Sequence, residues 1–342
     1  MVDSAREQAA AALGVHEDAL TFTSGGTESN NLALLGVMRS LPGPGSLVTT
    51  AIEHSSVLGA AEALAKEGHR CQLVRVDRSG QPDLDALCAA AAGARLVSVM
   101  AGNNEIGVCP PLRAIAERLP RGERGGRALL HADAAQAVGR IQIPWDELDL
   151  ASLSAHKFGG PVGSGLLVHR LGLRLEPILH GGGQELGLRP GTENAAAIAG
   201  TALALELACR DQENFARRTH GLASSLWEKL ARKLPGLELL GPALSAQGPQ
   251  TDRLPGTLNL LAHAVDGKVL VTRLDLAGLE VSAGSACASG SLEASHVLLA
   301  LGFDETRARA GLRVSFGRSS GAEDVDSAVE ILWRMLGGAH AL

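Results

Sequence analysis

The stretch "LTFTSGGTESNNLAL", residues 20–34, leads from a short apolar run through a polar turn into a segment with helical character. The run at 20–23 has the length and composition of a buried strand. Gly25 and Gly26 let the backbone turn tightly and point N–H groups outward. A helix beginning near Thr27 adds partial positive charge. The stretch predicts a strand–turn–helix unit that binds an anion, most often phosphate; an ordinary strand-to-helix turn is the alternative.

Similar apolar runs recur along the first part of the chain. They are mostly apolar on both faces, as in strands of a mainly parallel sheet covered by helices. We therefore predict an α/β sandwich, in which ligands bind beyond the carboxyl ends of the strands. The expected strands are residues 20–23, 46–50, 72–76, 95–101, 128–133, 150–155 and 165–169.

The pattern changes from about Asn194, where one long helix or two abutting helices are expected. A smaller α+β unit should follow. The sequence thus predicts a large α/β domain over residues 1–210 and a small C-terminal domain over 211–342. In the small domain the expected strands are 256–262, 279–283 and 312–317, and the expected helices are 267–277, 294–301 and 321–337.

The composition narrows the class of partner. The 342 residues are 45% hydrophobic and carry a formal charge of -6, so nothing favours nucleic acid or an anionic membrane. Five scattered cysteines form no CxxC pair, which fits a reducing compartment better than disulfides or zinc. The N-terminus resembles neither a signal nor a transit peptide, and no run is apolar enough to span a membrane. We expect a cytoplasmic protein.

Two further motifs follow strand runs. In "HADAAQ", Asp133 ends a strand and Gln136 comes three residues later, a spacing that puts both side chains on one face of a starting helix. Asp133 could hold a ring nitrogen protonated, or simply cap that helix. In "SLSAHKFGG", Ser154 and His156 can share one side of an extended chain, and Lys157 follows. Lys157 is either a surface lysine or one that forms a Schiff base.

His54 in "AIEHSSV" and Asn104 in "GNNEIGV" also lie just past strand runs. A phosphate turn, an acid for a ring nitrogen, a lysine for an aldehyde and a histidine beside a ring together indicate pyridoxal 5'-phosphate. A Rossmann dinucleotide site is the rival, but no GxGxxG follows the early strands. Arg313 lies in an otherwise apolar strand, where it needs an anion: a carboxylate, or a salt-bridge partner. Arg318 is the less favoured candidate.

These motifs, with "GGGQELGLRPGTEN", "SAGSACASG" and "LRVSFGR", resemble the cysteine desulfurases of the NifS/IscS type. Those enzymes belong to the class V aminotransferase superfamily and have the fold-type I architecture of PLP-dependent transferases. The resemblance implies conversion of L-cysteine to L-alanine, with the sulfur passing to Cys287 as a persulfide and then to an acceptor. An iron–sulfur scaffold protein or the tRNA thiolation pathway could be that acceptor.

The resemblance also implies a role for each motif residue. Lys157 would form the Schiff base, and His54 would stack on the ring and could move protons. Asn104 and Arg313 would hold the substrate carboxylate. Thr192, in "RPGTEN", would reach the cofactor phosphate of a partner subunit, so a homodimer is expected. The remaining cofactor contacts would come from Gly26, Thr27, Asp133, Gln136, Ser154 and His156.

Three departures and two alternatives accompany the resemblance. Roughly fifty residues that precede the helix near Ser4 in the family are absent here. Cys109-Pro110 stands where the family usually has an apolar residue followed by glutamine. Leu186 stands where the family usually has an arginine. A selenocysteine lyase would use the same apparatus, although the Cys287 loop and its spacing to Arg313 look more like the desulfurases. A non-catalytic scaffold is the other alternative, supported by the shortened N-terminus.

Overall fold

A computed structural model describes residues 1–122, 126–261, 267–284 and 294–337. The chain divides into two compact units. The first comprises Met1–Arg75, Pro82–Gly102 and Pro110–Gln212, and the second comprises Val76–Gln81, Asn103–Cys109 and Glu213–Leu342. Two short segments from the first half of the chain therefore belong to the second unit. Cys287 lies outside the described residues.

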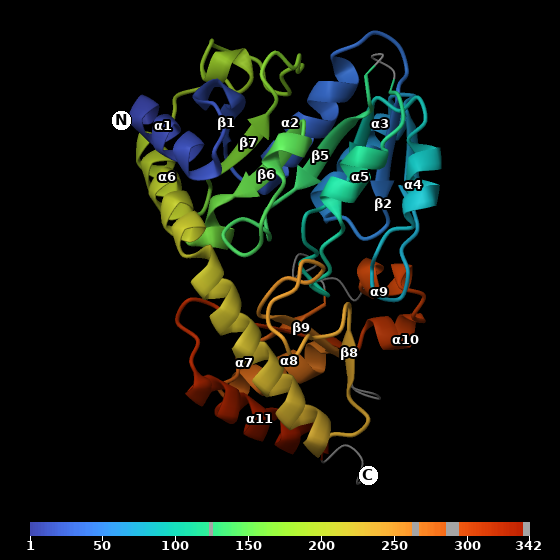
Figure 1. Ribbon diagram of the computed structural model, residues 1–342, viewed down its shortest axis with the longest axis vertical. Helices are drawn as coiled ribbons and strands as arrows, with labels where there is room; N and C mark the ends of the chain where they lie inside the picture. The colour runs from blue at the N-terminus through green and yellow to red at the C-terminus, as the bar shows by residue number, and fades with distance from the viewer. Residues whose placement is uncertain (123–125, 262–266, 285–293, 338–342) are drawn as a thin grey trace. The chain divides into compact units, whose positions relative to one another are not determined.

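The first unit contains a seven-stranded sheet in the order β1-β7-β6-β5-β4-β2-β3 (Figure 1). β7 runs antiparallel to both its neighbours, and the other pairs are parallel. The mainly parallel α/β architecture predicted from the sequence is confirmed. The strands are β1 (Leu20–Thr23), β2 (Ser46–Thr50), β3 (Arg70–Val74), β4 (Leu96–Ser98), β5 (Leu129–Asp133), β6 (Leu150–Ser154) and β7 (Gly165–His169).

Alternate residues of these strands enter two separate cores, because successive side chains point to opposite faces. Leu47 and Leu96 pack with helices α2 and α3 on one face. Their neighbours Val48 and Val97 pack with α1, α5 and α6 on the other. The sheet is thus buried on both sides, which explains why its strands read as continuous apolar runs. The helices are α1 (Val2–Leu13), α2 (Gly26–Arg39), α3 (Ser55–Lys66), α4 (Leu84–Ala90), α5 (Leu112–Arg118) and α6 (Ala195–Arg210).

Two local expectations differ from the structure, and a third is decided by it. Hydrogen-bonded turns, and no helix, follow Asp133, because its own carboxylate accepts the N–H of Ala135 and Gly139 is left-handed at φ 69°. His156 and Lys157 lie in a 3₁₀ turn, η3 (Ala155–Phe158), so His156 does not continue the strand. The helical region after Asn194 is two abutting helices, α6 and α7 (Gln212–Lys233).

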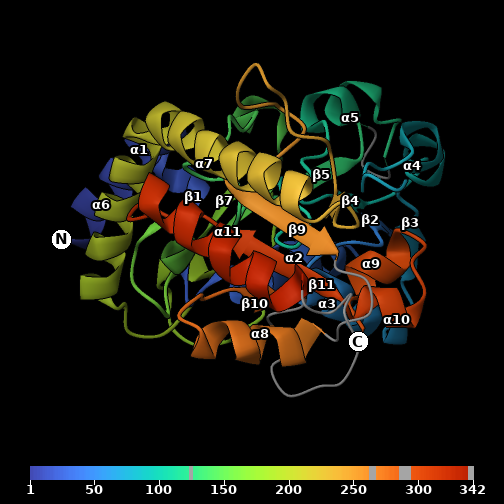
Figure 2. The ribbon, with the colours of Figure 1, turned by 90° about the horizontal axis from the view of Figure 1, so that it is seen from below.

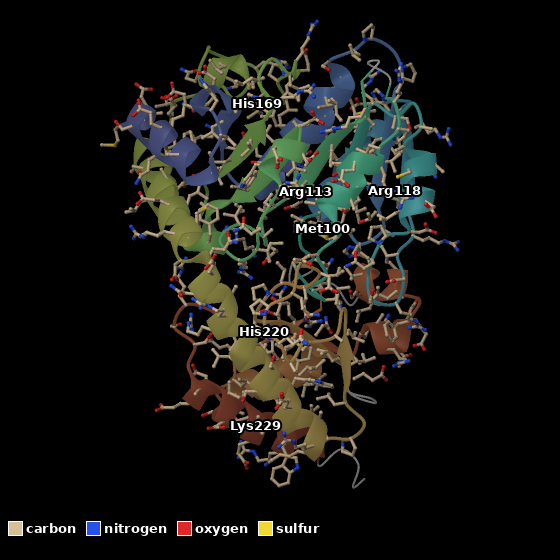
Figure 3. All side chains as sticks on the ribbon, in the orientation of Figure 1. Met100, Arg113, Arg118, His169, His220 and Lys229 are labelled. Atoms are coloured by element: carbon tan, nitrogen blue, oxygen red, sulfur yellow. The ribbon has the colours of Figure 1, made fainter. Side chains whose placement is uncertain are left out.

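The second unit is built on an antiparallel sheet in the order β10-β11-β9-β8. Helices α7 and α11 cover one face of it (Figure 2). Apolar side chains from both helices pack with those of β9 and β11. Lys229 of α7 pairs with Asp326 of α11 at 2.5 Å (Figure 3). The elements are β8 (Glu238–Leu240), β9 (Thr257–Leu261), β10 (Ser282–Ala283), β11 (Gly311–Ser315), α8 (Gly267–Leu276), α9 (His296–Ala300), α10 (Glu305–Ala308) and α11 (Ala322–Gly337).

Among the described residues, no helix is long and apolar enough to cross a membrane. The same part of the chain holds no group of three or more histidine, cysteine or acidic side chains that could bind a metal ion.

A buried ion pair ties the segment before α6 to β1 and α1. Glu185 accepts hydrogen bonds from Arg6 Nη2 at 2.7 Å and from the Phe22 N–H at 2.9 Å. The Glu185 side chain is only 1% exposed. Glu185 and Leu186 both have left-handed backbones, at φ 50° and 56°, which is costly for residues other than glycine. The ion pair therefore holds a strained turn in place.

Replacing Arg6 by alanine should destabilise the protein by about 3 kcal/mol, because the Glu185 carboxylate would stay buried without its cation. Adding Glu185→Gln should recover part of that loss, since the amide has no charge to leave unpaired. Arg210→Ala is the matched control, because Arg210 pairs with Glu206 on the surface of α6. Urea unfolding measures all three. Equal losses for Arg6→Ala and Arg210→Ala would contradict this reading of the pair.

Candidate active site

The glycine turn between β1 and α2 lies against the end of β6. A Cβ placed on Gly26 would be 3.3 Å from Ser154 Cβ and 3.9 Å from Ala135 Cβ. Gly25 has φ 153° and ψ 180°, a conformation open essentially to glycine. Thr27 is exposed in the first turn of α2. Three segments that follow three different strands thus converge at the N-terminus of a helix, which suits an anion.

The turn after β6 carries the predicted lysine. Ser154 Oγ is 3.1 Å from His156 Nδ1, so the two expected phosphate contacts are side by side. Lys157 is exposed in the same turn. Partial burial, reinforced by the charge on Lys157, lowers the pKa of His156. The imidazole is therefore neutral at pH 7 and can accept or donate one hydrogen bond at each nitrogen.

Asp133, at the carboxyl end of β5, is buried and accepts a hydrogen bond from a side chain of helix α2. Its Oδ2 accepts a hydrogen bond from Asn30 Nδ2 at 2.7 Å, and Asn30 projects from α2. The same Nδ2 donates to Ser56 Oγ at 2.9 Å. Ser56 in turn lies 2.8 Å from His54 Nδ1 through its hydroxyl. A continuous chain of hydrogen bonds therefore links His54 to Asp133.

The direction of this chain determines the tautomer of His54. The Ser56 backbone N–H donates to His54 Nδ1, which must therefore carry a lone pair. Because Ser56 Oγ already accepts from Asn30, its proton is free to point toward the same nitrogen. His54 accordingly carries its proton on Nε2.

Glu53 is a fully buried carboxyl group beside this network. Its Oε1 accepts hydrogen bonds from Thr50 Oγ1 at 2.7 Å and from the backbone N–H of Met100 at 3.0 Å. Burial raises the pKa of Glu53 to about 8; the two hydrogen bonds lower it, and the charge of Asp133 raises it further. Glu53 is thus protonated at neutral pH. The network contains one negative carboxylate, Asp133, rather than two.

The other expected cofactor residues are less enclosed. Gln136 is half-buried in the turn after Asp133. Thr192 is exposed between the 3₁₀ turn η4 (Glu185–Gly187) and α6. The Gly191 N–H donates to Gln184 Oε1 at 3.1 Å, and Asn194 caps α6 by accepting the Ala197 N–H at 3.1 Å. Thr192 is thereby presented on a segment that is fixed at both ends.

The second unit brings the two expected carboxylate-binding residues together. Arg313 Nη1 donates to the backbone oxygen of Asn104 at 2.8 Å. Arg313 projects from β11, and both residues are half-buried. This hydrogen bond uses one nitrogen of the Arg313 guanidinium. It involves the main-chain oxygen of Asn104 and not its side-chain amide.

Two departures from the family pattern have a structural description. Cys109 is buried, with Sγ 3.7 Å from the Gly107 carbonyl, and burial raises the pKa of its thiol. Such a thiol is a poor nucleophile. Leu186 is exposed and sits in the strained turn held by Glu185.

Sequence reasoning passed over three residues of this site: Asn30, Ser56 and Glu53. All three lie in motifs that predict the site through other residues: Asn30 in "SGGTESNN", and Glu53 and Ser56 in "AIEHSSV". A polar residue inside a helix that otherwise reads as buried, as Asn30 does in α2, is the signal that could have identified one of them.

The buried acid Glu53 should make stability fall as the pH rises. The unfolded chain releases this proton above about pH 4.5 and the folded chain keeps it to about pH 8. Between those values the folded state binds more protons, so stability is lost with rising pH. Glu53→Gln, which resembles the neutral acid, should gain on the order of 3 kcal/mol over wild type between about pH 5 and pH 8. Urea unfolding at the two pH values tests this.

Glu62→Gln in α3 is the control, because the same change there affects an exposed carboxylate. A Glu53→Gln variant whose stability falls with pH as steeply as wild type would show that Glu53 is ionised in the folded protein.

Comparisons with known proteins agree with this geometry. The model of the class-V aminotransferase family matches residues 1–328. The cysteine desulfurase IscS of Dictyoglomus turgidum is 38% identical over 339 residues, 98% of this chain and 83% of that protein. A cysteine desulfurase of Nostoc sp. is 37% identical over 344 residues, 100% of this chain and 83% of that one.

The solved structures agree as well. A structure titled as a NifS-like protein superimposes with a TM-score of 0.88 at 33% identity, covering 98% of this chain and 87% of that one. DndA from Streptomyces lividans gives 0.76 at 36% identity, with coverages of 92% and 87%. The resemblance read from the sequence is confirmed: the chain belongs to the class-V aminotransferase family, alongside relatives that are named cysteine desulfurases.

Proposed function

We propose that this protein is a pyridoxal-phosphate-dependent cysteine desulfurase. It would convert L-cysteine to L-alanine and move the sulfur to Cys287 as a persulfide, from which an acceptor takes it. The observation that carries the proposal is the convergence of the Gly25-Gly26 turn, Ser154 and the buried Asp133 at the carboxyl ends of β1, β6 and β5. The names of the relatives support the same reaction.

The residues of the first unit fit the cofactor. The Gly26 N–H, Thr27, Ser154 and His156 would bind its phosphate at the N-terminus of α2. Asp133 would accept the ring N–H, held in place by Asn30. Gln136 would contact the ring hydroxyl, and His54 would lie against the ring face. When bound through Lys157, the cofactor supplies an electron sink for the bonds around the substrate Cα.

The chain's own groups move the protons. Lys157 Nζ, once displaced by the substrate amine, would take the Cα proton, and Lys157 or His54 Nε2 would return a proton to the substrate. Asn104 and Arg313 would hold the substrate carboxylate, since a guanidinium fork matches a carboxylate. A protonated Glu53 would leave Asp133 as the negative group facing the ring nitrogen.

Sulfur transfer needs no outside oxidant. The Cys287 thiolate attacks the substrate sulfur, an S–S bond forms and the substrate C–S bond breaks. The electron pair of that C–S bond stays with carbon, which becomes the methyl carbon of alanine after protonation. One cysteine and one enzyme thiol therefore give one alanine and one persulfide. The four described cysteines are free thiols, in keeping with a reducing compartment such as the cytoplasm.

We further propose a homodimer in which Thr192 completes the partner's phosphate site. Thr192 is exposed within its own chain, on a segment held by Gln184 and by the Asn194 cap. A fixed, exposed hydroxyl of this kind suits a contact supplied to a second copy. The acceptor of the sulfur would be a further protein, such as an iron–sulfur scaffold or a component of tRNA thiolation.

Incubation with L-cysteine should add about 32 Da, one sulfur atom, to the peptide that contains Cys287. Cys287→Ala should keep the visible absorption of the bound cofactor but form no persulfide and little alanine. Lys157→Ala should lose that absorption and all alanine formation. Mass spectrometry and an alanine assay measure these outcomes, with selenocysteine as a second substrate. Alanine release by Cys287→Ala at the wild-type rate would remove the nucleophile from the mechanism, and an inactive wild type would favour a scaffold.

Shared sites in a dimer predict complementation between two defective subunits. At limiting cofactor, Lys157→Ala should be inactive and Thr192→Ala weakly active, because each dimer has two damaged sites. In mixed dimers one site has both lesions and the other has neither, so refolding an equal mixture should restore about a quarter of wild-type activity. A mixture no more active than its components would refute the contribution of Thr192 across the interface.

A further inference from the structure

Glu105 lies at the centre of a buried cluster in the second unit. It is 2% exposed and belongs to the segment Asn103–Cys109. Asn103 Oδ1 accepts the N–H groups of Glu105 and Ile106 at 2.8 and 2.9 Å, which forms a tight turn. Asn259 Nδ2, from β9, donates to the Glu105 carbonyl at 3.3 Å. The main chain of Glu105 is therefore fixed from both sides.

The side chain of Glu105 contacts two residues that are far from it in sequence and flank Cys287. Ser295 Oγ donates to Glu105 Oε2 at 2.6 Å. A Cβ placed on Gly284 would be 3.0 Å from the same oxygen and 3.2 Å from Ser295 Cβ. One carboxylate oxygen thus accepts the Ser295 hydroxyl and lies close to the backbone of Gly284. The ten residues 285–294 run between these two positions.

Both of these residues are also tied to the chain just before and within β11. The Gly284 N–H donates to the Gly311 carbonyl, and the Ser295 N–H donates to the Ala308 carbonyl, each at 3.3 Å. Ser282 pairs with Arg313 in the β10–β11 ladder. The base of the Cys287 segment is therefore built next to the residue proposed to bind the substrate carboxylate. The buried carboxyl group of Glu105 lies close to both ends of that segment.

Burial raises the pKa of Glu105 and is the largest effect on it; the Ser295 hydrogen bond and the charges of His296 and Arg313 lower that pKa by less. A hydrogen bond to a carboxylate is worth about 1.5–3 kcal/mol, more than one between neutral groups. A loop whose ends are joined also loses less entropy when its tip is held in one place.

From this arrangement we infer that Glu105 is a positioning residue for sulfur transfer: its carboxylate, through Ser295 and Gly284, holds together the two ends of the segment that carries Cys287. It touches neither substrate nor cofactor. The inference rests on the proposed function, because it assigns Cys287 the sulfur-accepting role.

The test compares variants of the full, cofactor-loaded protein by the rate at which Cys287 gains sulfur from L-cysteine. Glu105→Ala and Ser295→Ala each remove the same hydrogen bond and should lower the rate about tenfold. The double variant should fall no further, because the two changes break one interaction. Glu105→Gln, which keeps an acceptor for the Ser295 hydroxyl, should stay within about twofold of wild type. The affinity for the cofactor should not change.

Asp304→Ala is the matched control. Asp304 caps α10 in the same unit by accepting the Arg307 N–H at 2.9 Å, and it lies outside the cluster. It should therefore leave the rate of persulfide formation unchanged. A wild-type rate in Glu105→Ala, independent multiplicative losses in the double variant, or an equal loss in Asp304→Ala would overturn the inference. If Glu105→Ala fails to fold, Ser295→Ala and Glu105→Gln still decide between these outcomes.

A second readout separates this inference from the proposed function. Alkylation of Cys287 by iodoacetamide without L-cysteine depends on how the segment is held and not on catalysis. Glu105→Ala and Ser295→Ala should change its rate by the same factor, and Glu105→Gln and Asp304→Ala should not. A wild type that forms neither alanine nor persulfide, yet shows this alkylation pattern, would disprove the desulfurase activity and support the role of Glu105 in holding the segment. Identical alkylation rates in all variants would disprove that role.

Discussion

The hydrogen bond between Asn30 and Asp133 is the constraint on which the candidate site depends. It joins the first helix after the glycine turn to the end of the central strand β5, over 103 positions of sequence. The same Asn30 nitrogen reaches Ser56 and, through it, His54. The acid, the histidine and the phosphate turn are thus held by one amide. A shift of α2 along the sheet would disturb all three together.

Negative charge near Asp133 must be limited for this arrangement to work. Two ionised carboxylates close together in a buried site would repel each other, and one of them takes up a proton instead. Glu53 is that one, because its burial is complete and its pKa is raised to about 8. Glu53 therefore adds no negative charge at the position proposed for the partner of a ring nitrogen. Neutral His131, whose pKa burial lowers to about 3, adds no opposing positive charge beneath the sheet.

The sequence predicts the central strands well and the contacts between them poorly. The runs at 20–23, 46–50 and 165–169 coincide with β1, β2 and β7, because these strands are mostly buried and their apolar character marks their ends. The prediction for β3, residues 72–76, begins two residues too late. β3 is an edge strand that, unlike β1 at the other edge, is partly exposed, so its first residue, Arg70, carries no apolar signal.

In the site, too, positions along the chain were predictable and contacts between distant residues were not. Asp133, Ser154, His156 and the glycine turn could be identified because each lies at or just past the carboxyl end of a strand, and position in an α/β fold is encoded locally. Asn30 with Asp133, and Glu105 with Ser295, are pairs separated by 103 and 190 residues. Nothing in a single sequence specifies which distant polar group will meet a buried amide or acid. Those partners follow from the packed fold.

Three buried glutamates show how the functional turns are kept in place. Glu185 pairs with Arg6 and holds the segment that leads to Thr192. Glu53 stays neutral and joins the end of β2 to Met100 after β4. Glu105 has a hydroxyl donor and nearby positive charge, and meets both flanks of the Cys287 segment. A carboxyl group accepts several hydrogen bonds at once, so one buried residue can fasten two turns. Each of these turns lies near in sequence to a residue with a proposed role, namely His54, Thr192 or Asn104. Moving the acid away would leave its buried hydrogen-bond partners unpaired, which is costly, so the turn stays in place.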